Sequence, residues 1–128
     1  MNTHTSRSWH SGRPYSPAAS SGEWVYVSGQ VPVRADGSTA GEDAGEQVAQ
    51  VLQNVRAALE AAGSRMSDVV STQVFLTDIT DIDAVDAAYR DTFPEGAYPS
   101  RTTVEISRLG RPEFRVEISA VAHHVPGD

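Results

Sequence analysis

Cysteine and lysine are both absent from this sequence, and all 10 of its Lys+Arg residues are arginines. Without lysine, no side chain can form a Schiff base with a carbonyl substrate or hold pyridoxal phosphate covalently. Without cysteine, the chain has no thiolate nucleophile, no disulfide, no iron–sulfur cluster and no cysteine-bound zinc. Catalysis through a covalent lysine or cysteine intermediate is therefore excluded.

Positive charge and long apolar runs are also scarce. The 17 acidic residues outnumber the 10 arginines and give a net charge of −7, whereas proteins that bind phosphate backbones normally carry the opposite sign. No run approaches the roughly 18 apolar residues of a membrane span, and the polar start lacks the apolar stretch of a secretory signal. We therefore expect a soluble, cytoplasmic protein with no nucleic acid and no membrane partner.

The length of 128 residues favours a single domain over residues 1–128, because most domains contain about 50–200 residues. Residues 1–8 and residues 124–128 are expected to be a flexible lead and a flexible tail. The apolar, β-branched segment Trp24–Ser28 predicts a strand, with Ser16–Ser20 as its hairpin partner across Ser21-Gly22-Glu23.

A helix is predicted after Asp43, because Asp43 and Glu46 have the spacing of a capping box. Its C-terminal stop is Ala61-Ala62-Gly63. The three- and four-residue spacing of the apolar positions predicts a buried face made of Val48, Val51, Leu52, Val55 and Leu59, and an outward face made of Gln47, Gln50, Gln53 and Arg56.

The second half of the chain predicts strand, helix, strand, strand. Alternation over Val69–Thr77 places Val70, Thr72, Val74 and Leu76 on one face of a strand. A helix follows from Asp81 or Ile82 to Phe93, and the last strands lie near Arg101–Ile106 and Phe114–His123. This order fits an α+β fold: a two-layer sandwich of a mixed β-sheet with two helices on one face. If the other face is apolar, another subunit must cover it.

Arg101 is the first candidate for a functional side chain. It starts a predicted strand directly after Tyr98-Pro99-Ser100, which fixes its backbone while the guanidinium can point into a cleft. The planar guanidinium matches a carboxylate or phosphate with two parallel hydrogen bonds. The alternative is a surface arginine paired with an acid.

Glu117 is the second candidate, because it interrupts an apolar strand. Val116, Ile118, Ala120 and Ala122 line one face of this strand, and Glu117, Ser119 and Val121 line the other. Burial would raise the pKa of the Glu117 carboxyl towards that of a useful general acid or base. A cross-strand ion pair is the alternative for Glu117, and also for Glu105, which alternates onto one face with Arg101 and Thr103.

No metal site is expected. The neighbouring residues His123 and His124 point to opposite faces of a strand and cannot readily share an ion, while His4 and His10 lie in the polar N-terminal segment. The sequence also has no Ser-His-Asp elbow, no Walker motif and no G-x-G-x-x-G.

Several blocks in register resemble the RidA/YjgF family of reactive-intermediate (imine) deaminases, over roughly Tyr15 to Ala122. They are Pro14-Tyr15-Ser16-Pro17-Ala18, Val27-Ser28-Gly29-Gln30-Val31-Pro32, Asp68-Val69-Val70 with Val74-Phe75-Leu76-Thr77-Asp78, Tyr98-Pro99-Ser100-Arg101-Thr102-Thr103-Val104-Glu105 and Val116-Glu117-Ile118.

This resemblance implies a chorismate-mutase-like fold that assembles as a homotrimer with an active site in each cleft between subunits. It also implies that the partner is a small imine or enamine carboxylate, such as 2-aminoacrylate, which is hydrolysed to a 2-keto acid and ammonium without a cofactor. By position, Arg101 matches the arginine that holds the substrate carboxylate, and Glu117 the glutamate that activates water. Substrate-binding roles are implied for Tyr15, Ser28, Gly29, Thr103 and Asp86, and whether Arg101 and Glu117 of one cleft belong to one chain is left open.

Four positions depart from the family pattern. Asp86 stands where many members have asparagine, Thr103 where cysteine or serine is common, Arg13 replaces the glycine of Gly-Pro-Tyr, and Ser119 replaces a second glutamate. These departures leave two alternatives open, a biosynthetic tailoring enzyme that acts on a larger imine-like intermediate and a non-catalytic trimeric module that binds a small carboxylate. Ribonuclease labels have also been attached to this family, but the charge of −7 argues against RNA here.

Overall fold

The structure, a computed structural model, describes residues 2–4 and 12–125. Its helices are α1 (Ala44–Ala61) and α2 (Ile82–Thr92), with short 3₁₀ turns η1 (Met66–Asp68) and η2 (Ile79–Asp81). Its strands are β1 (Asn2–His4), β2 (Ala18–Ser21), β3 (Trp24–Gln30), β4 (Val69–Leu76), β5 (Ser100–Glu105) and β6 (Val116–His123). Within the expected lead, Asn2–His4 thus forms a strand, and the rest of residues 1–8 and the tail from residue 126 lie outside the described residues.

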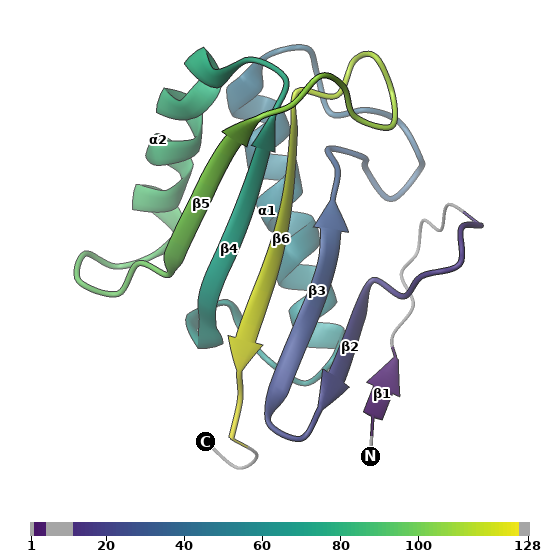
Figure 1. Cartoon of the computed structure of the whole chain (residues 1–128), viewed down its shortest axis with the longest axis vertical. Helices are drawn as coiled ribbons and strands as arrows, with labels where there is room; N and C mark the ends of the chain where they lie inside the picture. Colours follow the sequence, from purple (N-terminus) through teal and green to yellow (C-terminus); the bar gives the residue numbers. More distant parts are fainter. Residues whose placement is uncertain (1, 5–11, 126–128) are drawn as a thin grey trace.

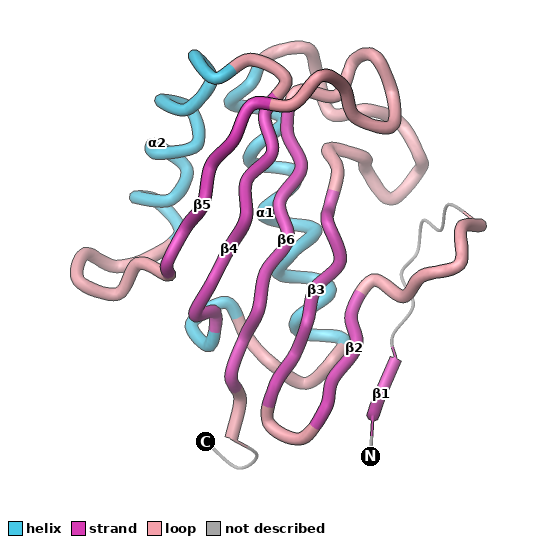
Figure 2. Tube along the Cα trace, viewed as in Figure 1, coloured by secondary structure: helices cyan, strands magenta, loops and turns pink. Residues whose placement is uncertain are grey.

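In the described part of the chain, the strands form one sheet in the order β1-β2-β3-β6-β4-β5. The β4–β5 pair is parallel and the other pairs are antiparallel. Both helices lie on the same side of this sheet (Figure 1). Figure 2 shows the two layers, with the helices in cyan and the strands in magenta. The predicted α+β architecture with a mixed sheet, and the predicted hairpin between β2 and β3, are confirmed.

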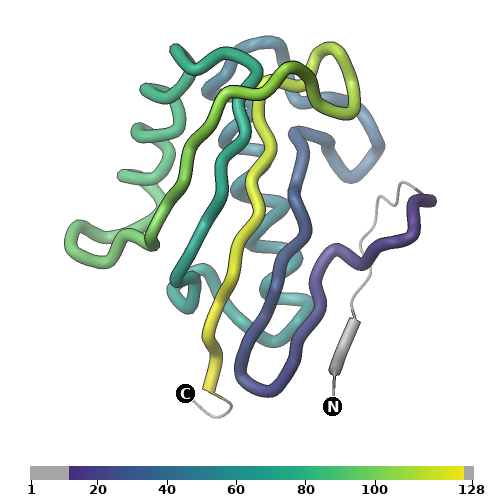
Figure 3. Tube along the Cα trace, in the orientation of Figure 1, coloured from purple at the N-terminus to yellow at the C-terminus, as the bar shows by residue number. Residues whose placement is uncertain are grey.

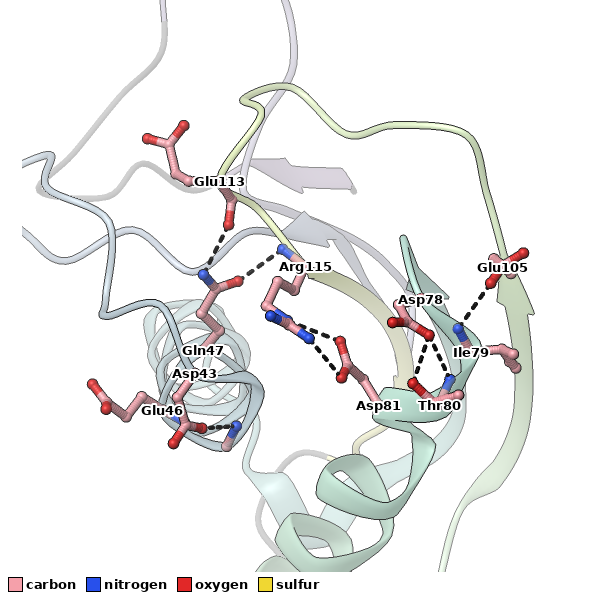
Figure 4. A network of polar contacts seen from close by, with 11 residues as sticks. Asp43, Glu46, Gln47, Asp78, Ile79, Thr80, Asp81, Glu105, Glu113 and Arg115 are labelled. Atoms are coloured by element: carbon pink, nitrogen blue, oxygen red, sulfur yellow. Dashed lines mark hydrogen bonds and ion pairs between the residues drawn. The ribbon is translucent and has the colours of Figure 1, made fainter.

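Helix α1 begins as the sequence predicts, since the Asp43 side chain accepts hydrogen bonds from the backbone N–H groups of Gly45 and Glu46. The prediction that Gln47 faces outward is wrong, because its side chain is fully buried. Its Nε2 donates to the carbonyl oxygen of Gly41. The same Nε2 also donates to the carbonyl oxygen of Glu113, and Oε1 accepts from the backbone N–H of Arg115 (Figure 4). Gln47 thus satisfies loop backbone groups that no strand pairs.

A β-bulge at the start of β4 changes the predicted alternation. Val69 pairs with Ala122 and Ser71 pairs with Val121, so that Val70 is an extra residue on β4. Val69 is consequently buried and Val70 is 45% exposed, which corrects the prediction that Val70 shares a face with Thr72, Val74 and Leu76, all three of which are buried. From Thr72 onward the alternation is as predicted.

The core lies between the helices and the inner face of the sheet. On β6, the predicted inward residues Val116, Ile118, Ala120 and Ala122 are all buried, and the partners that the helices supply include Val51, Val55, Leu59, Val85 and Tyr89. The burial of one complete face of β6 fixes its register, because a slip of one residue would expose this apolar row.

The opposite face of the sheet carries no helix, and large apolar side chains lie exposed on it. Trp24 and Tyr26 of β3 are 44% and 51% exposed, and Val104 of β5 is 39% exposed. Tyr26 pairs with Val121 of β6, and Val104 pairs with Phe75 of β4. The residues on either side of Val121 and of Phe75 are buried in the core, so these four side chains point to the opposite face. We call this the open face.

A second polar network closes the end of the molecule near η2. Arg115 donates from Nε and Nη2 to the two carboxylate oxygens of Asp81, both at 2.9 Å, and Asp78 accepts from the backbone N–H of Thr80 (Figure 4). These bonds hold the start of α2 against the residue that precedes β6, and so fix α2 relative to the sheet.

Neither helix in the described residues has the combined length and hydropathy that a membrane crossing needs.

Candidate active site

Arg101 lies near the start of β5, which is the edge strand at one end of the sheet (Figure 3). In the parallel pairing with β4, Arg101 is opposite Thr72, whose side chain is buried on the helix side. The Arg101 side chain therefore points to the helix side of the sheet, towards α2.

The guanidinium of Arg101 is held along one edge and on one face. Its Nη2 donates to Oδ1 of Asp86 at 2.6 Å, and its Cζ lies 4.9 Å from the centroid of the Tyr89 ring. The Tyr89 hydroxyl in turn donates to Oγ1 of Thr72 at 2.8 Å, which fixes the ring. Burial raises the pKa of Tyr89, against opposing effects of the Thr72 hydrogen bond and of Arg101, so the phenol stays protonated at neutral pH.

Arg101 does form an ion pair with an acid, Asp86, and both residues of this pair also line a pocket. A pocket of about 270 Å³ is lined by Asp86, Tyr89, Arg90, Tyr98, Pro99 and Arg101. The Arg101 side chain is only 23% exposed. Among the described residues, Asp86 accepts only from Nη2 of Arg101. The other N–H groups of the guanidinium can therefore donate to a carboxylate that enters the pocket.

The sequence did not identify Tyr89, Arg90 and Tyr98 as residues that line the pocket. A signal existed for each, because Asp86, Tyr89 and Arg90 have the spacing of one helical face and Tyr98 stands three residues before Arg101. Tyr89 serves two roles, because its ring is buried in the core and one face of the ring supports the guanidinium.

Glu117 lies on the open face. Its neighbours Val116 and Ile118 are buried in the core, so the Glu117 side chain points to the other side, opposite Phe75 of β4. Among the described residues no ion pair involves Glu117, which makes the cross-strand ion pair wrong for this residue. Burial raises the pKa of the Glu117 carboxyl above its ordinary value, in the predicted direction.

The Glu117 carboxylate lies directly over Gly29. A Cβ placed on Gly29 would overlap this carboxylate, with Glu117 Cδ only 2.7 Å away, so any larger residue here would displace the Glu117 carboxylate. The register between β3 and β6 shifts between Val27 and Gln30, which places Ser28 and Gly29 in a bulge. Bulges of this kind re-aim the chain beside functional sites.

Ser28 and Tyr15 lie at the same end of β3. Oγ of Ser28 donates to the carbonyl oxygen of Ser16 at 2.6 Å, and the Ser28 N–H donates to the carbonyl oxygen of Pro17. This pair of bonds ties the segment that carries Tyr15 to the bulge. The Tyr15 side chain is 44% exposed.

The candidate residues therefore form two groups. Arg101, Asp86 and Thr103 belong to the helix side, since Thr103 pairs with the buried Val74. Glu117 and Gly29 belong to the open face, with Ser28 and Tyr15 beside them. In one chain β4 lies between β5 and β6, and the side chains of Arg101 and Glu117 project to opposite faces of the sheet.

Glu105 and the two C-terminal histidines have structural partners. Glu105 accepts a hydrogen bond from the backbone N–H of Ile79 at 3.0 Å (Figure 4). Nε2 of His123 lies 3.3 Å from Glu23, and Nδ1 of His124 lies 2.8 Å from Asp68. In residues 2–4 and 12–125 no three histidine or acidic side chains are grouped as metal ligands would be.

Comparison with known proteins gives concordant matches. The family model described as endoribonuclease L-PSP matches residues 5–124. The 2-iminobutanoate/2-iminopropanoate deaminase of Salmonella typhimurium is 39% identical over 111 residues, covering 85% of this chain and 86% of that protein. The crystal structure of the Rid family protein YyfA of Yersinia pestis, of unknown function, has a TM-score of 0.89 at 33% identity and covers 96% of this chain and 99% of its own. The YjgF gene product of E. coli has a TM-score of 0.82 at 37% identity, with 91% of each chain covered.

Proposed function

Since the chain belongs to the YjgF/RidA family, whose family model is described as endoribonuclease L-PSP, we propose that it hydrolyses 2-imino and 2-enamino acids to 2-keto acids and ammonium in the cytoplasm. The observation that carries this proposal is the carboxylate of Glu117, which lies over the Gly29 bulge with a raised pKa and has no ion pair among the described residues. A carboxyl group with a raised pKa suits a general base near neutral pH. The net charge of −7 disfavours RNA as the substrate.

Arg101 binds the substrate carboxylate in this mechanism. The N–H groups that Asp86 leaves available form charge-assisted hydrogen bonds with the carboxylate, and the ring of Tyr89 keeps the guanidinium plane in place. Fixing the substrate in this way holds the imine carbon in a defined position for attack by water, which lowers the entropic cost of the reaction. Tyr15 closes the cleft, Ser28 and Gly29 line it, and the backbone at Thr103 lies beside the imine.

Glu117 activates the water. Its carboxylate takes a proton from water as the oxygen attacks the carbon of the protonated imine, which produces a neutral tetrahedral carbinolamine. The same carboxyl then donates this proton to the amine nitrogen and takes up the proton of the carbinolamine hydroxyl as the C–N bond breaks. The C=O bond of the 2-keto acid forms, and the departing ammonia carries this last proton away as ammonium. An enamine substrate first takes a proton on carbon to become the imine. No cofactor is needed, because no electrons are transferred.

We place each active site between two subunits of a homotrimer. Two observations support this: Arg101 and Glu117 project to opposite faces of one chain, and Trp24, Tyr26 and Val104 expose apolar surface on the open face. A cyclic trimer lets the edge strand β5 of one chain meet the open face of the next. Light scattering should then give three times the 13.7 kDa mass of the chain.

The proposed activity is tested by generating 2-imino acids with an amino-acid oxidase or a dehydratase and measuring keto-acid release with and without the purified protein. Substrates with several side chains are compared, including those derived from alanine and from 2-aminobutanoate. We expect faster release for at least one of them. Binding of 2-keto acids without faster release for any side chain would instead support a carboxylate-binding module.

Gly29→Ala should lower kcat strongly while the chain remains folded. The added methyl group occupies the position of the Glu117 carboxylate and displaces the base from the bulge. We expect kcat to fall by about tenfold or more, because misplacing a catalytic group by about 1 Å costs up to about 10²-fold. Gly110→Ala is the matched control, since its Cβ would lie 4.0 Å from the nearest atom, on Phe114. Equal kcat values for the two variants would argue against a role of Gly29 in placing Glu117.

A further inference from the structure

The pocket beside Arg101 contains an unusual balance of charges for a carboxylate site. Its lining includes two guanidinium groups, Arg90 and Arg101, and one carboxylate, Asp86. The Asp86 carboxylate is in direct contact with the guanidinium that would bind the substrate. The Asp86 carboxylate thus offsets the positive charge of Arg101, the guanidinium that it contacts.

Asp86 is placed to act on the ligand as well as on Arg101. Only its Oδ1 accepts a hydrogen bond from the described residues, and the side chain is 32% exposed. The other oxygen therefore remains available to a group that enters the pocket. Because Asp86 contacts Arg101 directly and both residues line the same pocket, a ligand that binds Arg101 in this pocket lies close to Asp86.

A second negative charge on such a ligand would be repelled. At such short separations in a partly buried site, screening by water is incomplete and like charges repel each other. Arg90, which is exposed and has no ion pair among the described residues, attracts the ligand only weakly because it is surrounded by water. Asp86 thus opposes a dianion more than it opposes a monoanion.

We infer that Asp86 is a specificity-determining residue, which restricts the site to substrates with a single carboxylate and rejects those with a second anionic group on the side chain. The inference rests on the proposed function for the identity of the reaction, and on the Asp86–Arg101 contact for the selectivity. Imines derived from alanine-like amino acids are accepted, and those derived from aspartate or glutamate are rejected.

Asp86→Asn tests this selectivity with little change of shape. The asparagine Oδ1 can still accept the hydrogen bond from Arg101, so the guanidinium keeps its orientation while one negative charge is removed. Asp91→Asn is the matched control, because Asp91 lies on the same helix but does not line the Arg101 pocket.

Calorimetry gives the readout without turnover. The two ligands are 2-oxoglutarate and 5-methyl-2-oxohexanoate, in which an isopropyl group replaces the second carboxylate at similar size. We expect the wild-type protein to prefer the monoanion, and Asp86→Asn to shift the ratio of the two Kd values by about tenfold towards 2-oxoglutarate. Asp91→Asn should leave the ratio unchanged.

An unchanged ratio in Asp86→Asn overturns the inference, as does the absence of binding of both ligands to all three proteins. Imine hydrolysis is measured separately on the same samples. A shifted ratio without hydrolysis of any imine refutes the proposed function and retains the selectivity, whereas hydrolysis with an unchanged ratio refutes the selectivity alone.

Discussion

Replacing Arg101 by alanine is expected to lower kcat/KM for imine hydrolysis by about 10²–10⁴-fold, because two charge-assisted hydrogen bonds to the substrate carboxylate are lost. The loss should appear in binding as well as in rate, since the carboxylate is held before and during the reaction. The measurement is the coupled imine assay, with calorimetric binding of a 2-keto acid alongside. The fold should persist, because the partner Asp86 becomes more hydrated when Arg101 is removed.

Two further variants make the Arg101 result specific. Arg101→Lys retains the charge but lacks the planar fork, and we expect it to recover only part of the lost activity. Arg56→Ala removes an exposed arginine of α1 that does not line the Arg101 pocket, and it should behave as the wild type. Wild-type kcat/KM in Arg101→Ala would refute the carboxylate clamp.

Replacing Glu117 by glutamine is expected to lower kcat by about 10²–10⁴-fold, the contribution typical of a positioned general base. Glutamine has nearly the same shape and keeps the contact with Gly29, but it cannot take a proton from water. KM should change little, since Arg101 still binds the substrate. In the wild type, kcat should rise with pH through the raised pKa of Glu117, and this step should be missing in Glu117→Gln.

The ionisation of Glu117 that increases kcat as pH rises should at the same time lower the stability of the fold. Because burial raises the pKa of Glu117 above its unfolded value, the folded chain binds the proton more tightly, and the ionised form destabilises the fold at neutral pH. The free energy of unfolding should therefore fall as pH rises from the unfolded to the folded pKa. Glu117→Gln removes this cost, so its Tm at neutral pH should equal or exceed that of the wild type. A lower Tm together with unchanged kcat would contradict the assignment of Glu117 as the buried base.

Much of the fold could be predicted from the sequence, because local patterns determine it. The apolar alternation of β6 and the capping residue Asp43 both act within a few residues of chain, and both predictions are confirmed. Gln47 and Val70 were placed wrongly for non-local reasons. Gln47 is buried because its side chain hydrogen-bonds to the backbone of the loop at Glu113. Val70 faces outward because a β-bulge shifts the register of β4 against β6.

The candidate site could be predicted only in part. The sequence singled out Arg101 and Glu117, and alternation alone gives the face on which each lies relative to its own neighbours. It could not show that these faces are opposite, because that depends on how β5, β4 and β6 pair in the sheet. Nor could it show the Asp86–Arg101 contact, which depends on the packing of α2 against β5.

The central claim is that the two catalytic side chains of each site come from different subunits. It is tested most directly by co-expressing Arg101→Ala and Glu117→Gln chains with two different tags and isolating the mixed trimers. Each variant alone is expected to lose about 10²–10⁴-fold in activity. Every mixed trimer contains one cleft with both residues intact, so we predict about one third of wild-type activity. Mixed trimers that are as inactive as the single variants would contradict the claim.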